Sequence, residues 1–143
     1  EVSALLRARA SLFDSALTEL FNTQPWPKRE DQGDLPLALL AVGGYGRAEM
    51  APHSDVDLLF LYPYKQTPWV EQVIEFTLYL LWDLGLKLGH SARSIDECMR
   101  QAKADTTIST AILEARFIIG DDDLYREMRG RYGRDIVAGH GLA

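Results

Sequence analysis

The sequence predicts an α/β (α+β) fold in which a small mixed sheet is flanked by helices. Two short apolar runs, 37–42 and 56–62, are bounded by proline or glycine, as buried strands commonly are. Longer segments around them have apolar residues every three or four positions, a spacing typical of amphipathic helices. With 143 residues the chain is long enough for one domain with a single core.

The first part of the chain is predicted to contain a helix, a loop and a strand. Residues 2–21 carry an apolar stripe with helical spacing. The segment 22–35 combines prolines and a glycine with several charges, which favours a loop. The strand at 37–42 follows and is bounded by Pro36 and Gly43.

Proline and glycine also mark the limits of the central elements. The strand at 56–62 is stopped by Pro63. A helix begins at Pro68, because proline is favoured in the first turn, and ends at Gly85, because glycine is favoured just beyond a helix. Polar and apolar residues alternate over 86–93, which predicts a third strand.

The last part of the chain is predicted to be helical. Ser94 and Glu97 have the spacing of a capping box, so a helix should begin directly after Ser94. A further helix should follow Asp105, and a short last helix is expected over 124–132. The expected buried positions of the helix after Asp105 are Ile108, Ala111, Ile112, Ala115 and Ile119.

Charge and composition exclude several classes of protein. The chain has 15 basic and 21 acidic residues, whereas nucleic-acid binding depends on neutralising phosphates, so no nucleic-acid partner is expected. No apolar run approaches the roughly 20 residues that span a bilayer, so no membrane partner is expected either. The single cysteine, Cys98, cannot form an internal disulfide or a thiolate zinc cluster. We expect a cytoplasmic domain that is part of a longer chain.

The residues with the clearest chemical meaning lie at the ends of the two apolar strands. The strand at 37–42 runs into Gly43 and Gly44, where backbone N–H groups can approach an anion closely. The next strand opens with Asp55 and Asp57. Because residues i and i+2 of a strand project to the same face, these carboxylates should lie together, and a divalent cation would relieve their repulsion. Oxygen ligands combined with substrate phosphates suit Mg²⁺.

Each of these features also has a purely structural interpretation. A glycine cluster after a strand is commonly only a turn, and Asp-x-Asp at a strand start is commonly solvated or caps the backbone. Their occurrence on consecutive strands favours a phosphate site beside a metal-binding pair. The Walker phosphate loop is excluded because no Gly-Lys-Ser/Thr occurs, and the glycine spacing excludes the dinucleotide fingerprint.

The same residues carry a resemblance to a known family. Gly43-Gly44, followed after ten residues by Asp55-x-Asp57, resembles the signature of the DNA polymerase β-like nucleotidyltransferase superfamily. The longer string from Ala41 to Leu59 resembles the N-terminal catalytic domain of the bifunctional bacterial PII-protein uridylyltransferases, which also remove the uridylyl group. Matching stretches continue through Gln66-Thr67-Pro68-Trp69, Leu80-Leu81-Trp82-Asp83-Leu84-Gly85, Gly89-His90-Ser91 and Leu113-Glu114-Ala115-Arg116, so the resemblance covers roughly 37–132.

The resemblance implies a definite enzyme activity. The implied reaction transfers UMP from UTP to a tyrosine of the PII signal protein and releases pyrophosphate. This modification of PII would be part of nitrogen-status signalling. Asp55 and Asp57 would be the catalytic carboxylates and would hold Mg²⁺, or Mn²⁺ in its place. The implied phosphate-binding residues are Gly43, Gly44, Arg47 and Ser54.

The resemblance also implies how the chain is organised. Residues 1–143 would form a single nucleotidyltransferase domain of a longer chain. An N-terminal helix and loop would occupy 1–35, the catalytic sheet region 36–93 and a helical region 94–143. Removal of UMP would belong to a His-Asp hydrolase domain outside this segment, accompanied by small ligand-sensing domains.

Two departures from the superfamily pattern leave alternatives open. Ala48 stands where such sequences usually have glycine. Superfamily members also often carry a third carboxylate on a later strand, but the strand predicted at 86–93 has no acid. Apart from Lys87 and Arg93, its only titratable residue is His90. The acids considered as substitutes are Asp83, Asp96 and Asp105. The alternatives are a different protein nucleotidylyltransferase and a catalytically silent module that senses or binds a nucleotide.

Overall fold

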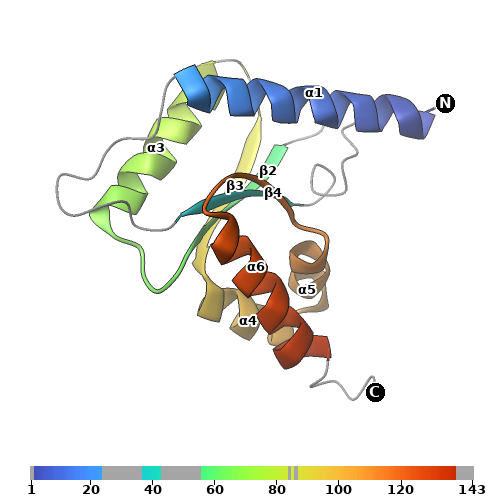
Figure 1. Cartoon of the computed structure of the whole chain (residues 1–143), viewed down its shortest axis with the longest axis vertical. Helices are drawn as coiled ribbons and strands as arrows, with labels where there is room; N and C mark the ends of the chain where they lie inside the picture. Colours follow the sequence, from blue (N-terminus) through green and yellow to red (C-terminus); the bar gives the residue numbers. More distant parts are fainter. Residues whose placement is uncertain (1, 24–36, 43–55, 84, 86, 138–143) are drawn as a thin grey trace.

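The fold consists of a four-stranded sheet with helices on both faces (Figure 1). The structure is a computed structural model that describes residues 2–23, 37–42, 56–83, 85 and 87–137. In chain order the elements are α1 (Val2–Thr23), β1 (Ala38–Val42), β2 (Val56–Tyr62), α3 (Pro68–Asp83), β3 (Leu88–Ser94), α4 (Ile95–Ala104), α5 (Thr106–Leu113), β4 (Arg116–Gly120), α6 (Asp122–Arg131) and the π-helix η1 (Tyr132–Val137). Among the described residues no helix is both long and apolar enough to cross a bilayer.

The sheet is mixed, as the sequence predicts. Its strand order is β3-β2-β1-β4, with β1 antiparallel to both β2 and β4, and β2 parallel to β3. Parallel neighbours need a crossover connection, and α3 supplies it between β2 and β3. The fold-class prediction of a small mixed sheet flanked by helices is therefore confirmed.

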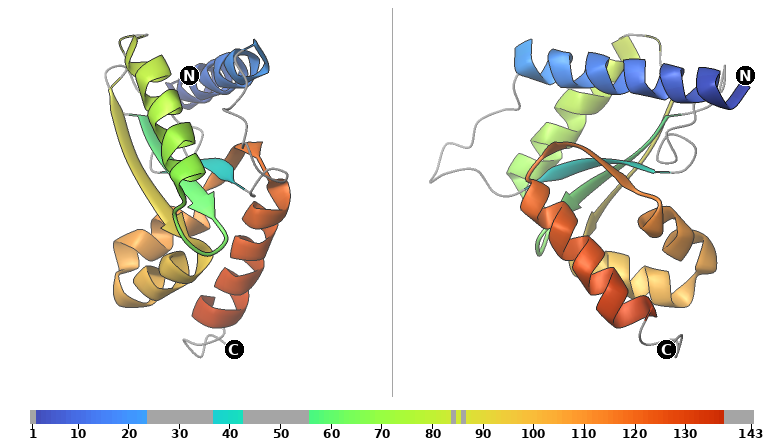
Figure 2. Two further views of the ribbon diagram at one scale, coloured as in Figure 1. Left: turned by 90° about the vertical axis from the view of Figure 1, so that its left-hand side faces the viewer. Right: turned by 45° about the vertical axis from the view of Figure 1, so that its right-hand side comes forward.

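Alternation along the strands divides the core between the two faces of the sheet. On one face, Leu39 and Phe60 are completely buried and pack with side chains of α1 and α3. Leu17 is the α1 residue in this cluster, and α3 contributes Trp69, Val70, Val73, Ile74, Leu78 and Leu81. Figure 2 shows α1 and α3 together on one side of the sheet, and α4, α5 and α6 on the other.

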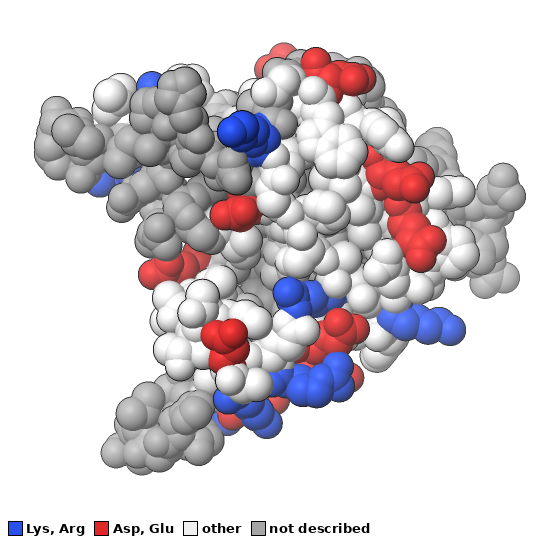
Figure 3. Space-filling model, turned by 180° about the vertical axis from the view of Figure 1, so that it is seen from behind, with Lys and Arg blue, Asp and Glu red and all other residues white. Residues whose placement is uncertain are grey.

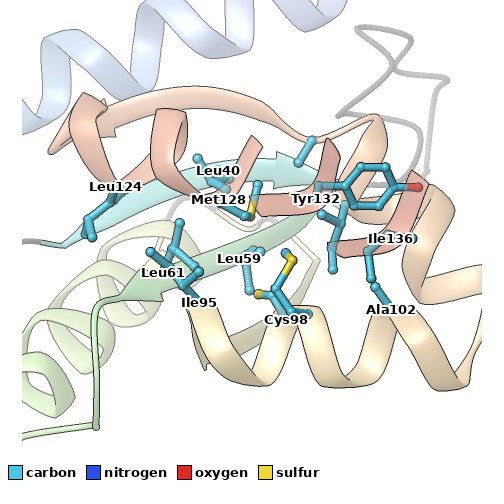
Figure 4. Close-up of a cluster of buried hydrophobic side chains, with 14 residues drawn as sticks. Leu40, Leu59, Leu61, Ile95, Cys98, Ala102, Leu124, Met128, Tyr132 and Ile136 are labelled. Carbon is cyan, nitrogen blue, oxygen red and sulfur yellow. The ribbon is translucent and has the colours of Figure 1, made fainter. Parts of the chain in front are cut away.

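The second face of the sheet is covered by the C-terminal helices. Leu40 and Leu59 lie opposite each other in the β1–β2 register and pack against this layer (Figure 4). Cys98 and Met128, from α4 and α6, meet over these strands and are completely buried. Burial raises the pKa of the Cys98 thiol to about 12, so this group is a neutral packing residue and not a nucleophile near pH 7.

One sequence prediction is wrong: the helix after Asp105 does not extend to Ile119. α5 ends at Leu113, and Arg116–Gly120 is strand β4. The residues at 117–119 are aromatic or β-branched, which favours a strand, and β4 pairs with the edge of β1 that β2 leaves open. The region 94–143 therefore contains a strand as well as helices.

The predicted helix boundaries are confirmed where they depend on capping chemistry. The Ser94 hydroxyl accepts a hydrogen bond from the backbone N–H of Glu97 at 3.1 Å and caps α4. Gly85, with φ of +79°, follows α3 and donates its N–H to the Trp82 carbonyl at 2.8 Å. That φ lies in the left-handed region, which glycine adopts without steric cost.

Replacing Ser94 with alanine is expected to lower the free energy of unfolding by about 1 kcal/mol, because the Glu97 N–H loses its acceptor at a buried helix start. Chemical denaturation measures the change. The matched control is Ser94→Thr, which keeps a hydroxyl at the cap and should recover most of the loss. Equal destabilisation by both substitutions would show that packing, and not capping, makes Ser94 important.

Candidate active site at one end of the sheet

Of the predicted site residues, the structure describes Asp57. Gly43, Gly44, Arg47, Ser54 and Asp55 lie outside the described residues, as does Ala48. Their roles therefore stay predictions.

Asp57 lies at the end of the sheet where β1 ends and β2 begins. It is the second residue of β2, and its register partner on β1 is Val42, the last residue of that strand. The chain leaves β1 and enters β2 at the same end because the two strands are antiparallel. This placement agrees with the sequence argument, which expects the end of the first strand to lie beside the start of the second.

The side chain of Asp57 belongs to the face that the C-terminal helices cover. Because side chains alternate between the two faces of a strand, Asp57 is on the same face as Leu59 and Leu61, which pack against α4 and α6. Unlike those leucines, Asp57 is only partly buried, because it stands at the end of the strand. A partly exposed carboxylate at a sheet end can both bind a cation and meet a substrate from solvent.

Gly89 lies beside Asp57 on the neighbouring strand and was not singled out as a site residue from the sequence. The two residues are partners in the parallel β2–β3 register. A Cβ atom built on Gly89 would stand 2.4 Å from Asp57 Oδ1 and 3.6 Å from Asp57 Cγ. The carboxylate therefore occupies the space that any other side chain at position 89 would need. Glycine inside a strand is the sequence signal for such a close approach.

None of the acids considered as a third carboxylate is placed beside Asp57 by the described contacts. Asp96 lies in the first turn of α4, beyond the opposite end of β3, and forms an ion pair with Arg131. The hydrogen bond from Arg131 to Asp96 is the main cause that raises the pKa of Arg131. Asp105 caps α5 by accepting the N–H of Thr107 at 2.8 Å.

The two remaining candidates lie on α3 and β3. Asp83 is the last residue of α3. His90 is exposed and is the register partner of Leu58, whose side chain packs on the α1–α3 face. Within the described part of the chain, no three His, Cys, Asp or Glu side chains are grouped closely enough to hold a metal ion. Of the two carboxylates predicted to hold the metal, Asp57 is among the described residues and Asp55 lies outside them.

Charge is mixed over the described surface. Arg116 of β4 forms an ion pair with Asp14 and so joins the sheet to α1. On α6, Arg126 pairs with Asp122 one turn earlier. Figure 3 shows basic and acidic side chains next to one another on the face opposite to the view of Figure 1, with no continuous basic area among the residues coloured there.

The donor chemistry of Asp57 fits a magnesium ion. Its carboxylate is a hard oxygen ligand, it is partly exposed at a sheet end, and Gly89 leaves room for it against β3. The fold is thus a mixed α/β domain with a carboxylate near the start of a strand at one end of its sheet.

The comparisons with known proteins find relatives that share one name. The chain is 55% identical over 131 residues to the bifunctional uridylyltransferase/uridylyl-removing enzyme of Azospirillum brasilense, a match that covers 92% of this chain and 14% of that protein. It is also 55% identical over 128 residues to the enzyme of the same name from Rhodopseudomonas palustris, covering 90% of this chain and 13% of that protein. The suspected resemblance to a segment of this enzyme is therefore confirmed. The names of these relatives support nucleotidyl transfer in general.

The other comparisons add nothing to this result. No protein-family model matches the chain. A solved toxin–antitoxin structure with AMP-PNP matches 91% of this chain and 98% of its own, at 12% identity and a TM-score of 0.45. That likeness is too low to bear on function. The chain spans about one seventh of the length of the curated relatives it matches.

Proposed function

We propose that this chain is the nucleotidyl-transfer domain of a protein that moves UMP from UTP to a tyrosine of the PII signal protein. The single observation that carries the proposal is the 55% identity to the bifunctional enzymes over nine-tenths of the chain. The position of Asp57 at a sheet end, in the space above Gly89, supports a site of this kind. On the same likeness, we propose that the complete protein acts in nitrogen signalling and also carries the hydrolase activity.

The reaction is a phosphoryl-centred substitution. The tyrosine hydroxyl oxygen forms a bond to the α-phosphorus of UTP, while the bond from that phosphorus to the bridging oxygen of the β-phosphate breaks. Pyrophosphate leaves, and the hydroxyl proton passes to solvent. A bound magnesium ion, or manganese in its place, would supply positive charge against the phosphate oxygens.

The residues of the chain divide the remaining work. Asp55 and Asp57 would hold the metal, because residues two positions apart in an extended chain project to the same side. The backbone N–H groups of Gly43 and Gly44 would donate hydrogen bonds to the phosphate oxygens at close range, because neither residue has a Cβ. Arg47 and Ser54 would complete the contacts to the phosphate chain.

Nucleotide selectivity separates this proposal from its alternatives. The complete protein is incubated with PII, Mg²⁺ and either UTP or ATP, and pyrophosphate release is followed. We expect release with UTP and little with ATP. Release with ATP alone would indicate another protein nucleotidylyltransferase. Nucleotide binding without pyrophosphate release would indicate a silent binding module.

Replacing Gly44 tests the predicted phosphate contact. We expect Gly44→Ala to weaken Mg²⁺-dependent UTP binding about tenfold or more, because a Cβ would stand where a phosphate must approach the backbone. Calorimetric titration measures the affinity, and a melting curve verifies the fold. A folded Gly44→Ala protein with parental affinity would place the phosphate contact elsewhere.

A further inference from the structure

The backbone of β3 gives no reason for a glycine at position 89. The glycines with positive φ in the described chain are Gly85 and Gly120, so Gly89 has a conformation that any L-residue adopts. Glycine within a strand costs stability, because it orders a more flexible backbone and packs no side chain. The feature that excludes a side chain at this position must therefore lie outside the Gly89 backbone.

That feature is the carboxylate of Asp57. The built Cβ would be 2.4 Å from Oδ1, a separation that real Cβ contacts essentially never show. Among the described residues, the atoms within 4 Å of this Cβ position belong to Asp57 alone. Gly133 provides a contrast, because a Cβ there would meet no described atom within 4 Å. Among the described residues, a side chain at position 89 would therefore clash with Asp57.

The direction of this effect follows from the sheet. Backbone pairing fixes the strands at positions 57 and 89, whereas the carboxylate can rotate about its side-chain bonds. An added methyl group would accordingly displace the carboxylate and leave the strands in place. For a ligand that must hold a cation, such a displacement changes the geometry that magnesium requires.

We propose that Gly89 is a positioning residue for the nucleotidyl-transfer site: by lacking a side chain, it allows the Asp57 carboxylate to lie against β3 in its metal-binding orientation. This inference rests on the proposed function of Asp57. It assigns a role to the third strand, which carries no acid of its own. In place of a third carboxylate, β3 contributes the space that orients the carboxylate of the neighbouring strand.

The test compares Gly89→Ala with Gly133→Ala in the complete protein. The first measurement is the affinity for UTP by calorimetry over a range of Mg²⁺ concentrations. We expect Gly89→Ala to raise the Mg²⁺ concentration needed for half-maximal binding about 10- to 100-fold, the usual effect of disturbing a residue that orients a metal ligand. Gly133→Ala should leave that concentration unchanged. Parental Mg²⁺ dependence in a folded Gly89→Ala protein would overturn the inference.

A double substitution distinguishes positioning from a general structural role. If Gly89 acts through Asp57, adding Gly89→Ala to Asp57→Asn should cause much less further loss of Mg²⁺-dependent binding than Gly89→Ala causes alone. Equal losses in both backgrounds would overturn the inference. If Gly89→Ala does not fold, Gly89→Ala combined with Asp57→Ala should restore folding by removing the clash, and failure to do so would also overturn it.

The same data separate failure of the inference from failure of the proposed function. If Asp57→Asn weakens Mg²⁺-dependent UTP binding but Gly89→Ala does not, only the role of Gly89 is wrong. If Asp57→Asn binds UTP with the parental Mg²⁺ dependence, the metal-binding role of Asp57 is wrong and the inference fails with it.

Discussion

Replacing Asp57 with asparagine is expected to lower UMP transfer by about two orders of magnitude or more while leaving the protein folded. The amide nearly preserves the shape of the carboxylate but removes the negative charge that would hold a cation. Because Asp57 is only partly buried near the start of β2, replacing its carboxylate removes no apolar packing. The melting temperature of the metal-free protein should be unchanged or slightly higher, since repulsion with Asp55 is relieved.

Initial rates of transfer and a melting curve for each variant test this prediction. Asp55→Asn should show the same pattern. Asp123→Asn is a matched control, because the side chain of Asp123 on α6 is 89% exposed and far along the chain from the site. A folded Asp57→Asn protein that transfers UMP at nearly the parental rate would show that Asp57 is an ordinary surface acid.

Replacing Phe60 with alanine is expected to lower the free energy of unfolding by about 3–5 kcal/mol. Phe60 lies in the middle of β2, is fully buried, and packs in the cluster that joins the sheet to α1 and α3. The cost combines lost apolar burial with the cavity that remains. Because domains are commonly stable by only about 5–15 kcal/mol, this change would leave a marginal fold.

Urea denaturation of the parent and variant measures this loss. Tyr64→Ala is the control, because it also removes an aromatic ring but from a position that is 85% exposed. We expect Tyr64→Ala to change the free energy of unfolding by about 0.5 kcal/mol or less. Comparable losses at both positions would mean that burial in this cluster does not dominate the stability of the sheet.

Local signals in the sequence predicted most of the elements correctly. Pro68 and Gly85 bracket α3, and the hydroxyl of Ser94 caps α4, because these features depend on residues close together in the chain. β4 was missed for the opposite reason. The run around Phe117 continues the apolar spacing of α5, and what makes it a strand is pairing with β1, more than 70 residues earlier in the chain.

In the candidate site, too, features that depend on neighbouring residues could be predicted from the sequence, whereas features that depend on strand pairing could not. The i, i+2 spacing of Asp55 and Asp57, and the place of Asp57 near the start of a strand, could be read directly from the sequence. The role of Gly89 could not, because it depends on the β2–β3 register, which sets Asp57 opposite Gly89 across a crossover helix. The likeness to the bifunctional enzymes supports a reaction type that spacing alone leaves open.

Label transfer from UTP to PII tests the central claim most directly. The complete protein, in parental and Asp57→Asn forms, is incubated with PII, Mg²⁺ and UTP labelled at the α-phosphate, and the modified residue is identified. The parental protein is predicted to place the label on a tyrosine of PII, and the Asp57→Asn protein to leave nearly all of it in UTP. Absence of label on PII with the folded parental protein, or equal labelling by both proteins, would contradict the account.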